Sequence, residues 1–157
     1  MRVSSGLQHY RHHSPFDLRQ ELSDVVGHVN LLSMGSLPPF IQPYASQPHV
    51  TVYSLDTRLP LVQQPRHIYA KPSEMPLGNE TFTVVYAGHF LPTGIRKNEQ
   101  SYSIAREAYR VLRRGGLFIF KSHSDEETTV QLYALGFHHI SHFPRTGSAL
   151  NVYAARK

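Results

Sequence analysis

The chain of 157 residues contains no cysteine. Disulfide scaffolds, cysteine-ligated zinc, iron–sulfur clusters and cysteine nucleophiles are therefore excluded. The chain also lacks any apolar run near the roughly 18 residues that a membrane-spanning helix needs. Its first residues, MRVSSGLQHYRHH, carry no apolar stretch behind their charges, so they do not form a secretory signal. We therefore expect a cytoplasmic protein with no membrane partner.

Acidic residues are few, 11 against 16 lysines and arginines, so the formal net charge is +5. A basic chain can bind nucleic acid. Here the positive residues are scattered, and the densest group, within residues 106–114, has the spacing of a solvated helix face. We therefore expect no nucleic-acid partner, and an RNA-binding domain is the weakest of the three interpretations that we weigh.

Histidine is abundant, with 11 residues. His9, His12 and His13 have spacings that a metal site can use. No acid or cysteine stands near them, and we expect His138 and His139 to point to opposite faces of a strand. The sequence therefore predicts no native metal site.

Apolar periodicity predicts alternating helices and strands in a chain that is 40% hydrophobic. The pattern predicts helices over residues 15–26, 99–113 and 124–136, and strands over residues 29–32, 49–56, 67–70, 82–90, 117–123, 138–143 and 149–156. Ser14 and Pro15 mark the first helix start, as an N-cap followed by proline.

This order of elements is typical of an α/β fold with a single Rossmann-like, mostly parallel sheet and helices on both faces. The last two strands, joined by Pro-Arg-Thr-Gly, predict a C-terminal antiparallel hairpin. We expect an N-terminal arm over residues 1–14 and one domain over residues 15–157.

Ligands of open α/β sheets bind at the carboxyl ends of the strands. Gly35 follows the strand at residues 29–32, and Asp56 ends the next strand, 21 positions later. A glycine turn with an acid about 20 residues on is the spacing of a nucleotide site, where the carboxylate binds ribose hydroxyls. An aspartate that ends a strand is as often a turn former or a helix cap, so both interpretations stay open.

Two segments, EMPLGNETFTVVYAGHFL and REAYRVLRRGGLFIF, carry a resemblance to a known family. In the second, a helix ending in Arg-Val-Leu-Arg-Arg-Gly-Gly runs into the next strand. The ending, YALGFHHI and LNVYAARK, fits as well. From Val29 to its C-terminus the chain resembles the class I S-adenosylmethionine-dependent methyltransferases, of which the small-molecule type is most similar.

The resemblance implies S-adenosylmethionine as the cofactor, and it implies the residues that bind it. These cofactor-binding residues are Ser33, Gly35, Ser36, Asp56 and Tyr86. Asp56 takes the ribose, and the loop at Gly35 takes the methionine end. His89, at the end of the strand that carries Tyr86, is the candidate catalytic base. A histidine packed over the end of the sheet is the alternative for His89.

The cofactor loop departs from the family pattern of an acid followed by three alternating glycines. Ser33 stands in place of the acid, Gly35 alone of the glycines is kept, and Leu37 adds a side chain beside the backbone. Three prolines within residues 38–43 spoil the helix expected after the loop. Lys71 stands where the family often has an acid near the adenine. The glycine-rich loop is thus degenerate.

Two interpretations of function follow. The first is an S-adenosylmethionine-dependent methyltransferase-like protein, a transferase that methylates an unidentified small molecule. Base N-methylation is not expected, because Tyr-Ala-Gly-His-Phe stands in place of the usual Asn/Asp-Pro-Pro-aromatic motif. The alternative is a degenerate methyltransferase-fold protein without methyl transfer, which binds a protein partner or another ligand.

Overall fold

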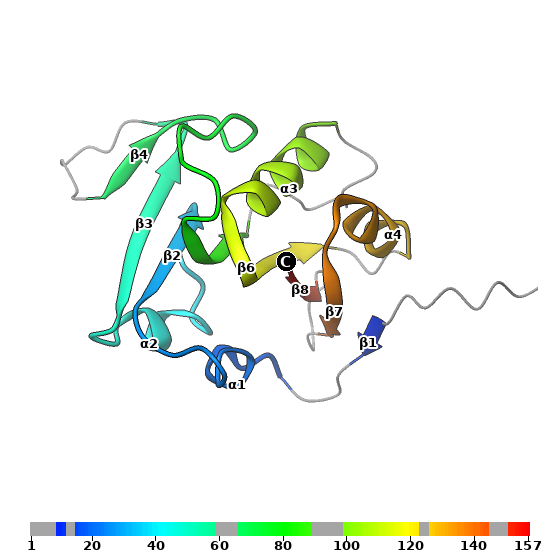
Figure 1. Ribbon diagram of the computed structural model, residues 1–157, viewed down its shortest axis with the longest axis horizontal. Helices are drawn as coiled ribbons and strands as arrows, with labels where there is room; N and C mark the ends of the chain where they lie inside the picture. Colours follow the sequence, from blue (N-terminus) through cyan, green and yellow to red (C-terminus); the bar gives the residue numbers. More distant parts are fainter. Residues whose placement is uncertain (1–8, 12–14, 59–65, 89–98, 123–125, 145–150) are drawn as a thin grey trace, which may run out of the picture.

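The computed structural model describes residues 9–11, 15–58, 66–88, 99–122, 126–144 and 151–157. Eight strands in this part of the chain form one sheet in the order β1-β7-β8-β6-β5-β2-β3-β4 (Figure 1). The strands are β1 (His9–Arg11), β2 (Val29–Met34), β3 (Val50–Asp56), β4 (His67–Tyr69), β5 (Phe82–Ala87), β6 (Leu112–Ser122), β7 (His138–Phe143) and β8 (Asn151–Arg156). The helices are α1 (Leu18–Glu21), α2 (Gln42–Ala45), α3 (Glu99–Val111) and α4 (Glu126–Leu135).

The sheet is mostly parallel, as the sequence predicts. Strands β4, β3, β2, β5 and β6 run in one direction, and β8 lies antiparallel between β6 and β7. The C-terminal antiparallel pair is therefore confirmed, but β8 is an interior strand of the sheet. The predicted fold class, a single Rossmann-like sheet with helices on both faces, is confirmed.

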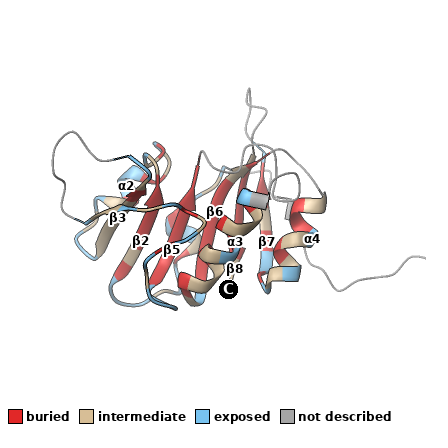
Figure 2. Ribbon diagram, turned by 90° about the horizontal axis from the view of Figure 1, so that it is seen from above, coloured by how far each residue is buried: buried red, intermediate tan, exposed pale blue. Residues whose placement is uncertain are grey.

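Two hydrophobic layers cover the two faces of the sheet. One layer, which we call the α3/α4 layer, contains side chains from α3 and α4, including Ile104, Ala108 and Leu132. The other, the α1/α2 layer, contains Leu18 of α1 and Tyr44 of α2. Figure 2 shows α3 and α4 together on one face, over strands that are buried along most of their length. Strands β5 and β6 lie in the middle of the sheet, and both of their faces are covered by these layers.

An additional strand, β1, lies at the edge of the sheet beside β7 (Figure 1). It pairs with β7 in parallel, with His9 opposite Ile140 and Arg11 opposite His142. The sequence predicted an N-terminal arm over residues 1–14 and no strand within it. Three polar residues give no alternating pattern, and their partner strand is far away in the sequence.

The first helix is shorter than predicted. We expected residues 15–26, whereas α1 is a single turn that starts after Asp17, whose carboxylate caps it. Ser14, the expected cap, lies outside the described residues. Leu22 is buried just past the helix, but Val26 is 92% exposed. Of the apolar residues beyond Leu22, Val25 still packs against the α1/α2 layer but Val26 does not, so the buried stripe is incomplete and tertiary packing does not extend the helix.

Strand β6 begins directly after α3, earlier than the predicted start at residue 117. Leu112 already pairs with Phe82 of β5, and the regular register resumes where Leu117 pairs with Val84. The residues between these two pairs form an irregular excursion of the strand. The glycine pair at 115–116 lies in this excursion, so it shapes a bulge in the sheet rather than the end of the helix.

The two glycines of the bulge serve different purposes. Gly115 has a φ of +76°, in the left-handed region that favours glycine. A Cβ atom on Gly116 would lie 2.8 Å from the carbonyl oxygen of Arg113 and 3.2 Å from that of Thr83, so no side chain fits there. The backbone of β6 can therefore approach β5 closely at this point.

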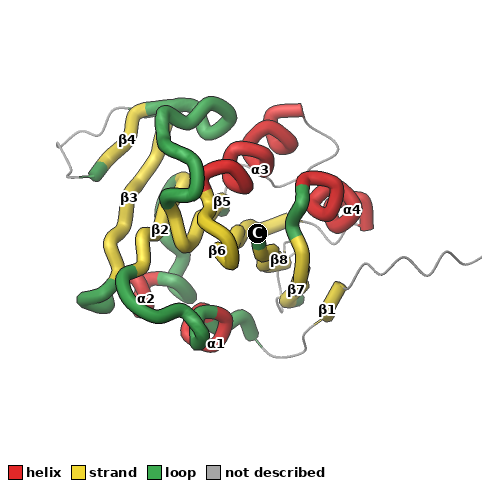
Figure 3. Tube along the Cα trace, viewed as in Figure 1, coloured by secondary structure: helices red, strands yellow, loops and turns green. Residues whose placement is uncertain are grey.

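An arginine on α3 ties the loop between β4 and β5 to the helix. The Arg110 guanidinium donates to both carboxylate oxygens of Glu107, each at 2.8 Å. It also donates to the carbonyl oxygens of Leu77 at 2.7 Å and Met75 at 3.0 Å, and to Asn79 Oδ1 at 2.9 Å. We call this group the Arg110 clamp. Figure 3 shows the loop it holds, which runs beside α3 on its way to β5.

Glu107 also binds the loop directly, because its carboxylate accepts a hydrogen bond from the N–H group of Met75, at 2.8 Å. The loop backbone then continues the bonding: Glu80 and Thr81 donate their N–H groups to the carbonyls of Arg110 and Val111. The end of α3 and the start of β5 are thus fixed to one another.

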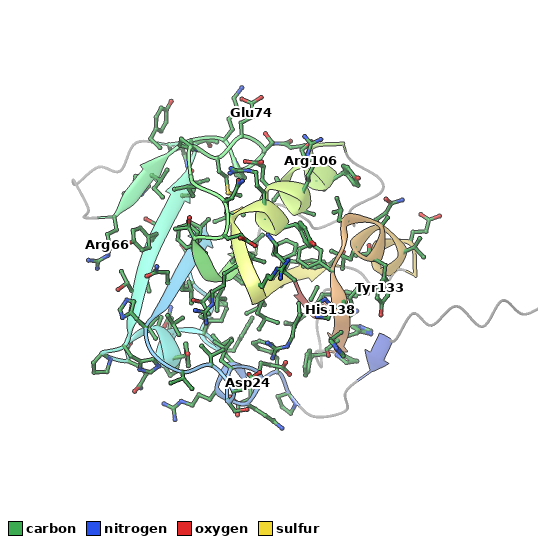
Figure 4. All side chains as sticks on the ribbon, viewed as in Figure 1. Asp24, Arg66, Glu74, Arg106, Tyr133 and His138 are labelled. Atoms are coloured by element: carbon green, nitrogen blue, oxygen red, sulfur yellow. The ribbon has the colours of Figure 1, made fainter. Side chains whose placement is uncertain are left out.

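Arg110→Lys should lower the free energy of unfolding by about 1–3 kcal/mol, because an ammonium group cannot satisfy the planar set of acceptors. Urea denaturation measures the change. Arg106→Lys is the matched control, since Arg106 is an exposed arginine on the same helix (Figure 4), and it should stay within about 0.5 kcal/mol of the parent. Equal losses in the two variants would show that the clamp does not hold the loop.

The stability of the protein should fall in acid through Glu107. The Arg110 hydrogen bonds lower the pKa of Glu107 below its ordinary value of 4.5, burial opposes them, and the Met75 N–H assists. A carboxyl group with a lowered pKa in the folded state stabilises the fold above its unfolded pKa, and this is lost as pH falls through the folded pKa. Urea titrations from pH 7 to about pH 3 should show that Glu107→Gln removes part of this acid dependence. Glu74→Gln, at an exposed carboxyl, should leave it unchanged.

Candidate functional site

The register of the sheet brings the predicted site residues to one edge. Met34 of β2 pairs with Leu55 of β3 on one side and with Ala87 of β5 on the other. The residues that follow these three strand positions, Gly35, Asp56 and Gly88, therefore lie at the carboxyl ends of neighbouring strands. This is the edge at which open α/β sheets bind ligands.

The turn after β2 is built on Gly35, which has a φ of +92°. Its N–H group donates to the Leu55 carbonyl at 3.4 Å, and its own carbonyl accepts the Ser33 hydroxyl at 2.6 Å. Ser33 is 1% exposed and belongs to β2, which extends two residues beyond the predicted strand. The hydroxyl proton of Ser33 is therefore used to brace the turn.

Asp56 ends β3 with a side chain that is 28% exposed. Its Oδ1 accepts the Arg58 N–H at 3.1 Å, and Arg58 Nε lies 3.6 Å from the same oxygen. Burial alone would raise the pKa of Asp56, but the Arg58 N–H and guanidinium and the Thr57 N–H together hold it below its ordinary value. Both contacts with Arg58 are made by Oδ1. Asp56 therefore caps the turn after β3 with a carboxylate that remains partly exposed at the edge.

Tyr86 lies beneath the edge, in the α1/α2 layer, with 1% of its surface exposed. Its ring folds over Gly88, where a Cβ atom would lie 2.7 Å from Tyr86 Cζ. The ring of Phe40 packs against it edge-on, with centroids 6.3 Å apart. The structure therefore places Tyr86 as a buried support of the strand end.

The prolines at residues 38–43 determine the conformation of the segment after Gly35. Ser36 is exposed, whereas Leu37 and Phe40 pack against the α1/α2 layer. The Pro38 carbonyl accepts two N–H groups, from residues 41 and 42, and α2 is a helix of four residues. As the prolines predict, no long helix starts at the glycine turn, and α2 is too short to present a helix dipole to a ligand.

An aromatic group that sequence reasoning missed flanks the same edge. Phe16 packs edge-on against Phe40 at 5.6 Å and against Phe143 at 5.1 Å, and Lys121 Nζ lies 5.8 Å from the centre of the Phe40 ring. These side chains come from separate segments of the chain, so no local pattern could have indicated the group. This aromatic group covers the α1/α2 side of the edge with apolar rings and one positively charged side chain.

The remaining predictions concern the catalytic base, metals and membranes. His89 lies outside the described residues. Among the described residues, no group of three or more histidine, aspartate or glutamate side chains is arranged to hold a metal ion. The helices that the structure describes include none with the length and apolar character to cross a membrane.

The profile of the methyltransferase-domain family matches residues 33–120, which is more than half of the chain. The chain therefore belongs to the class I S-adenosylmethionine-dependent methyltransferase family. It is a methyltransferase-like protein whose substrate is not identified. No curated protein sequence matches the chain.

Solved structures share the fold. The 1,6-didemethyltoxoflavin-N1-methyltransferase of Burkholderia thailandensis, solved with 1,6-didemethyltoxoflavin and S-adenosylhomocysteine, aligns over 88% of this chain and 75% of its own, with 16% identity and a TM-score of 0.60. An S-adenosylmethionine-dependent methyltransferase of Methanosarcina mazei aligns over 90% of this chain and 99% of its own, with 16% identity and a TM-score of 0.61. A chain of a complex that contains the Trm112 methyltransferase activator of Haloferax volcanii aligns over 88% of this chain and 87% of its own, with 9% identity and a TM-score of 0.60.

Ser33→Ala should loosen the glycine turn. The substitution removes a short hydrogen bond from a buried position, so we expect a loss of about 1 kcal/mol, or a melting temperature lower by about 2–4 °C. Differential scanning calorimetry measures the change. Ser36→Ala is the matched control on the exposed side of the same turn and should melt with the parent. A melting temperature unchanged in both variants would show that the Ser33 hydroxyl does not brace the turn.

Proposed function

We propose that the chain binds S-adenosylmethionine at the carboxyl ends of β2, β3 and β5 and transfers its methyl group to a small-molecule acceptor. The observation that supports this most strongly is the pairing of a glycine turn with a charged carboxylate on the next strand. Gly35 and Asp56 end adjacent strands in register, as a nucleotide site requires. The family match supports the choice of S-adenosylmethionine among nucleotide ligands.

Asp56 has the geometry for the ribose. Its Oδ1 is held by Arg58, which fixes the carboxylate, and the side chain remains 28% exposed. A carboxylate with a lowered pKa stays charged at neutral pH and accepts hydroxyl groups strongly. The Gly35 turn lets the backbone approach the methionine end, and Ser36 is exposed beside it.

When bound, S-adenosylmethionine supplies a methyl group on a positively charged sulfur. The contribution of this chain to the reaction is then to hold the acceptor in line with that group and to exclude water. His89 is proposed as the base that takes a proton from the acceptor. In the sequence it is separated from the end of β5 at Ala87 by one residue, Gly88.

A second candidate function is ligand or partner binding without methyl transfer. The specific observation behind it is the Ser33 hydroxyl, which closes on Gly35 instead of offering a carboxylate to the cofactor. Leu37 and Phe40 also pack where the family has glycines and a helix start. Each lost ligand contact weakens binding by about 1–3 kcal/mol, which turns micromolar affinity toward millimolar. In this case a protein partner is the natural alternative, given the fold shared with a chain in the Haloferax volcanii activator complex.

Calorimetric titration with S-adenosylmethionine and S-adenosylhomocysteine tests the proposal. The parent should bind both ligands, and Asp56→Asn should weaken each by about 10- to 100-fold, because it replaces a charged acceptor of ribose hydroxyls. Asp24→Asn is the matched control, since Asp24 is an exposed aspartate beside α1 (Figure 4). Its affinity should equal that of the parent.

Two results would contradict the proposal. Binding that is unaffected by Asp56→Asn would move the cofactor to another place on the fold. No heat up to millimolar ligand, from a protein that still melts cooperatively, would favour the second candidate function.

A further inference from the structure

Strand β4 lies at the end of the sheet, and no described strand is bonded to its outer side (Figure 1). On its inner side, the carbonyl of Arg66 accepts a hydrogen bond from β3 and the N–H group of Ala70 donates one, each at 3.1 Å. Alternate residues of a strand bond to the same neighbour, so Ile68, between these two, also bonds to β3. The N–H and C=O groups of His67 and Tyr69 therefore point outward, at the open edge of the sheet.

The side chains of this edge are also incompletely covered. Tyr69 is 62% exposed and is one of the three exposed large hydrophobic side chains that the structure describes. Ile68 lies on the opposite face of the strand and is only partly buried against the α3/α4 layer. An open strand edge that carries exposed apolar side chains is a template for pairing with another strand. The β4 edge thus has the features of an interaction surface.

The length of the edge restricts what pairs with it. The sequence has proline at residues 65 and 72, on both sides of β4, and proline has no N–H group for a sheet bond. A pairing strand therefore meets only residues 66–71. A short edge with proline at its ends also protects a sheet from open-ended aggregation. Such an edge fits one closed pairing rather than a growing fibre.

A second copy of β4 fits this edge when the two strands run antiparallel about Ile68. His67 of one copy then lies opposite Tyr69 of the other, twice by symmetry, and each of these pairs exchanges two backbone hydrogen bonds. All the outward backbone groups of the strand are then used. The two Ile68 side chains meet in the non-hydrogen-bonded pair, where side chains are closest. A register shifted by two residues would instead set Tyr69 opposite the proline at residue 65.

Exposed charges of opposite sign lie at the two ends of the strand. Arg66 is at the start of β4, and Glu74 is beyond its end (Figure 4). Arg66 Nε donates to the Val52 carbonyl at 3.1 Å, which leaves the two terminal amino groups of the guanidinium for another acceptor. Glu74 forms no ion pair with a residue that the structure describes. Each charge can therefore bind a partner of opposite sign.

Antiparallel pairing brings the start of one β4 beside the end of the other. Arg66 then lies opposite Ala70 of the second copy. The N–H group of Glu74 donates to the Lys71 carbonyl at 3.0 Å, so a tight turn holds Glu74 close to that position. An arginine and a glutamate therefore meet at both ends of the paired strands, which makes the identical surfaces complementary in charge. A parallel arrangement would instead put Arg66 beside Arg66.

We propose that the protein forms a symmetric dimer through the β4 edges of two copies, which joins their sheets into one continuous sheet. The strand pair is short, so the dimer is in equilibrium with the monomer and its fraction rises with concentration. The interface adjoins the strand that carries Asp56, but it does not depend on the proposed function.

Sedimentation equilibrium of the full chain tests the proposal. From micromolar to millimolar concentration, the mass should rise from 17.9 kDa toward twice that value. Tyr69→Pro should keep the protein monomeric, because proline removes an outward N–H group and leaves the bonds of Ile68 and Ala70 to β3 in place. Tyr69→Phe is the matched control, since it retains the N–H group and the ring, and it should dimerise like the parent.

Charge exchange tests the orientation of the two strands. Arg66→Glu and Glu74→Arg should each weaken the dimer by about tenfold, because like charges then meet at both ends. An equimolar mixture of the two variants should restore dimers that contain one copy of each, which native mass spectrometry distinguishes by mass. The loss of the Arg66 bond to Val52 is common to the variant alone and in the mixture, so it cannot explain the recovery. Lys71→Gln should strengthen the dimer, since Lys71 adds a positive charge near Arg66 of the second copy.

Three results would overturn the proposal. A monomer at millimolar concentration, from a protein that melts cooperatively, would leave the edge to a strand of another protein. Dimers that survive Tyr69→Pro, or that are unaffected by both charge variants, would place the interface elsewhere on the fold. A mixture of the charge variants that stays monomeric, while both variants melt cooperatively, would reject the antiparallel register. The dimer should form without S-adenosylmethionine, so failure of the proposed function leaves this test unaffected.

Discussion

The Arg110 clamp is the interaction on which the rest of the arrangement depends. The Arg110 guanidinium donates hydrogen bonds to the Glu107 carboxylate and to two loop carbonyls. Without these bonds, polar groups removed from water would lack partners, at a cost in free energy. It fixes the end of α3 beside the start of β5 and therefore sets the positions of the two central strands. This happens at the amino ends of the strands. The carboxyl ends are then free to vary in sequence without loss of the fold, and that is where this chain departs from its family.

The turn at Gly35 departs in sequence from the cofactor loop of the family, and hydrogen bonds within the protein hold its backbone. The family places an acid and several glycines here, whereas this chain has Ser33 and one glycine. The left-handed backbone of Gly35 persists because the Ser33 hydroxyl and the Leu55 carbonyl hold it from both sides. The conformation of this turn is thus held by bonds within the protein. The Asp56 carboxylate is held by the chain in a similar way, through the contacts of its Oδ1 with Arg58.

The buried parts of the fold could be predicted from the sequence, because their information is local. Continuous apolar runs identified β5 and β6, and the spacing of Gly35 and Asp56 identified two strand ends that the register does bring together. The first helix was predicted too long because the spacing of its leucines fits one turn as well as three. Tyr86 follows the family position for a cofactor contact, but only the structure shows its ring buried over Gly88.

Features that depend on distant partners could not be predicted. Two of the five acceptors of Arg110 are backbone carbonyls, which leave no trace in the sequence, and the Asn79 acceptor is 31 residues away in the chain. The aromatic group at Phe40 gathers side chains from separate segments. Strand β1 has no apolar alternation of its own.

The pairing of β1 with β7 has a consequence for the order of folding. His9 meets Ile140, a partner that the ribosome adds only after most of the domain has been made. Local pairs such as β2 with β3 close over short loops, whereas this pair closes over nearly the whole chain and pays the larger loop entropy. The first strand in the sequence is therefore among the last to join the sheet. Because it is three residues long and sits at an edge, we expect it also to be among the first to separate when the sheet opens.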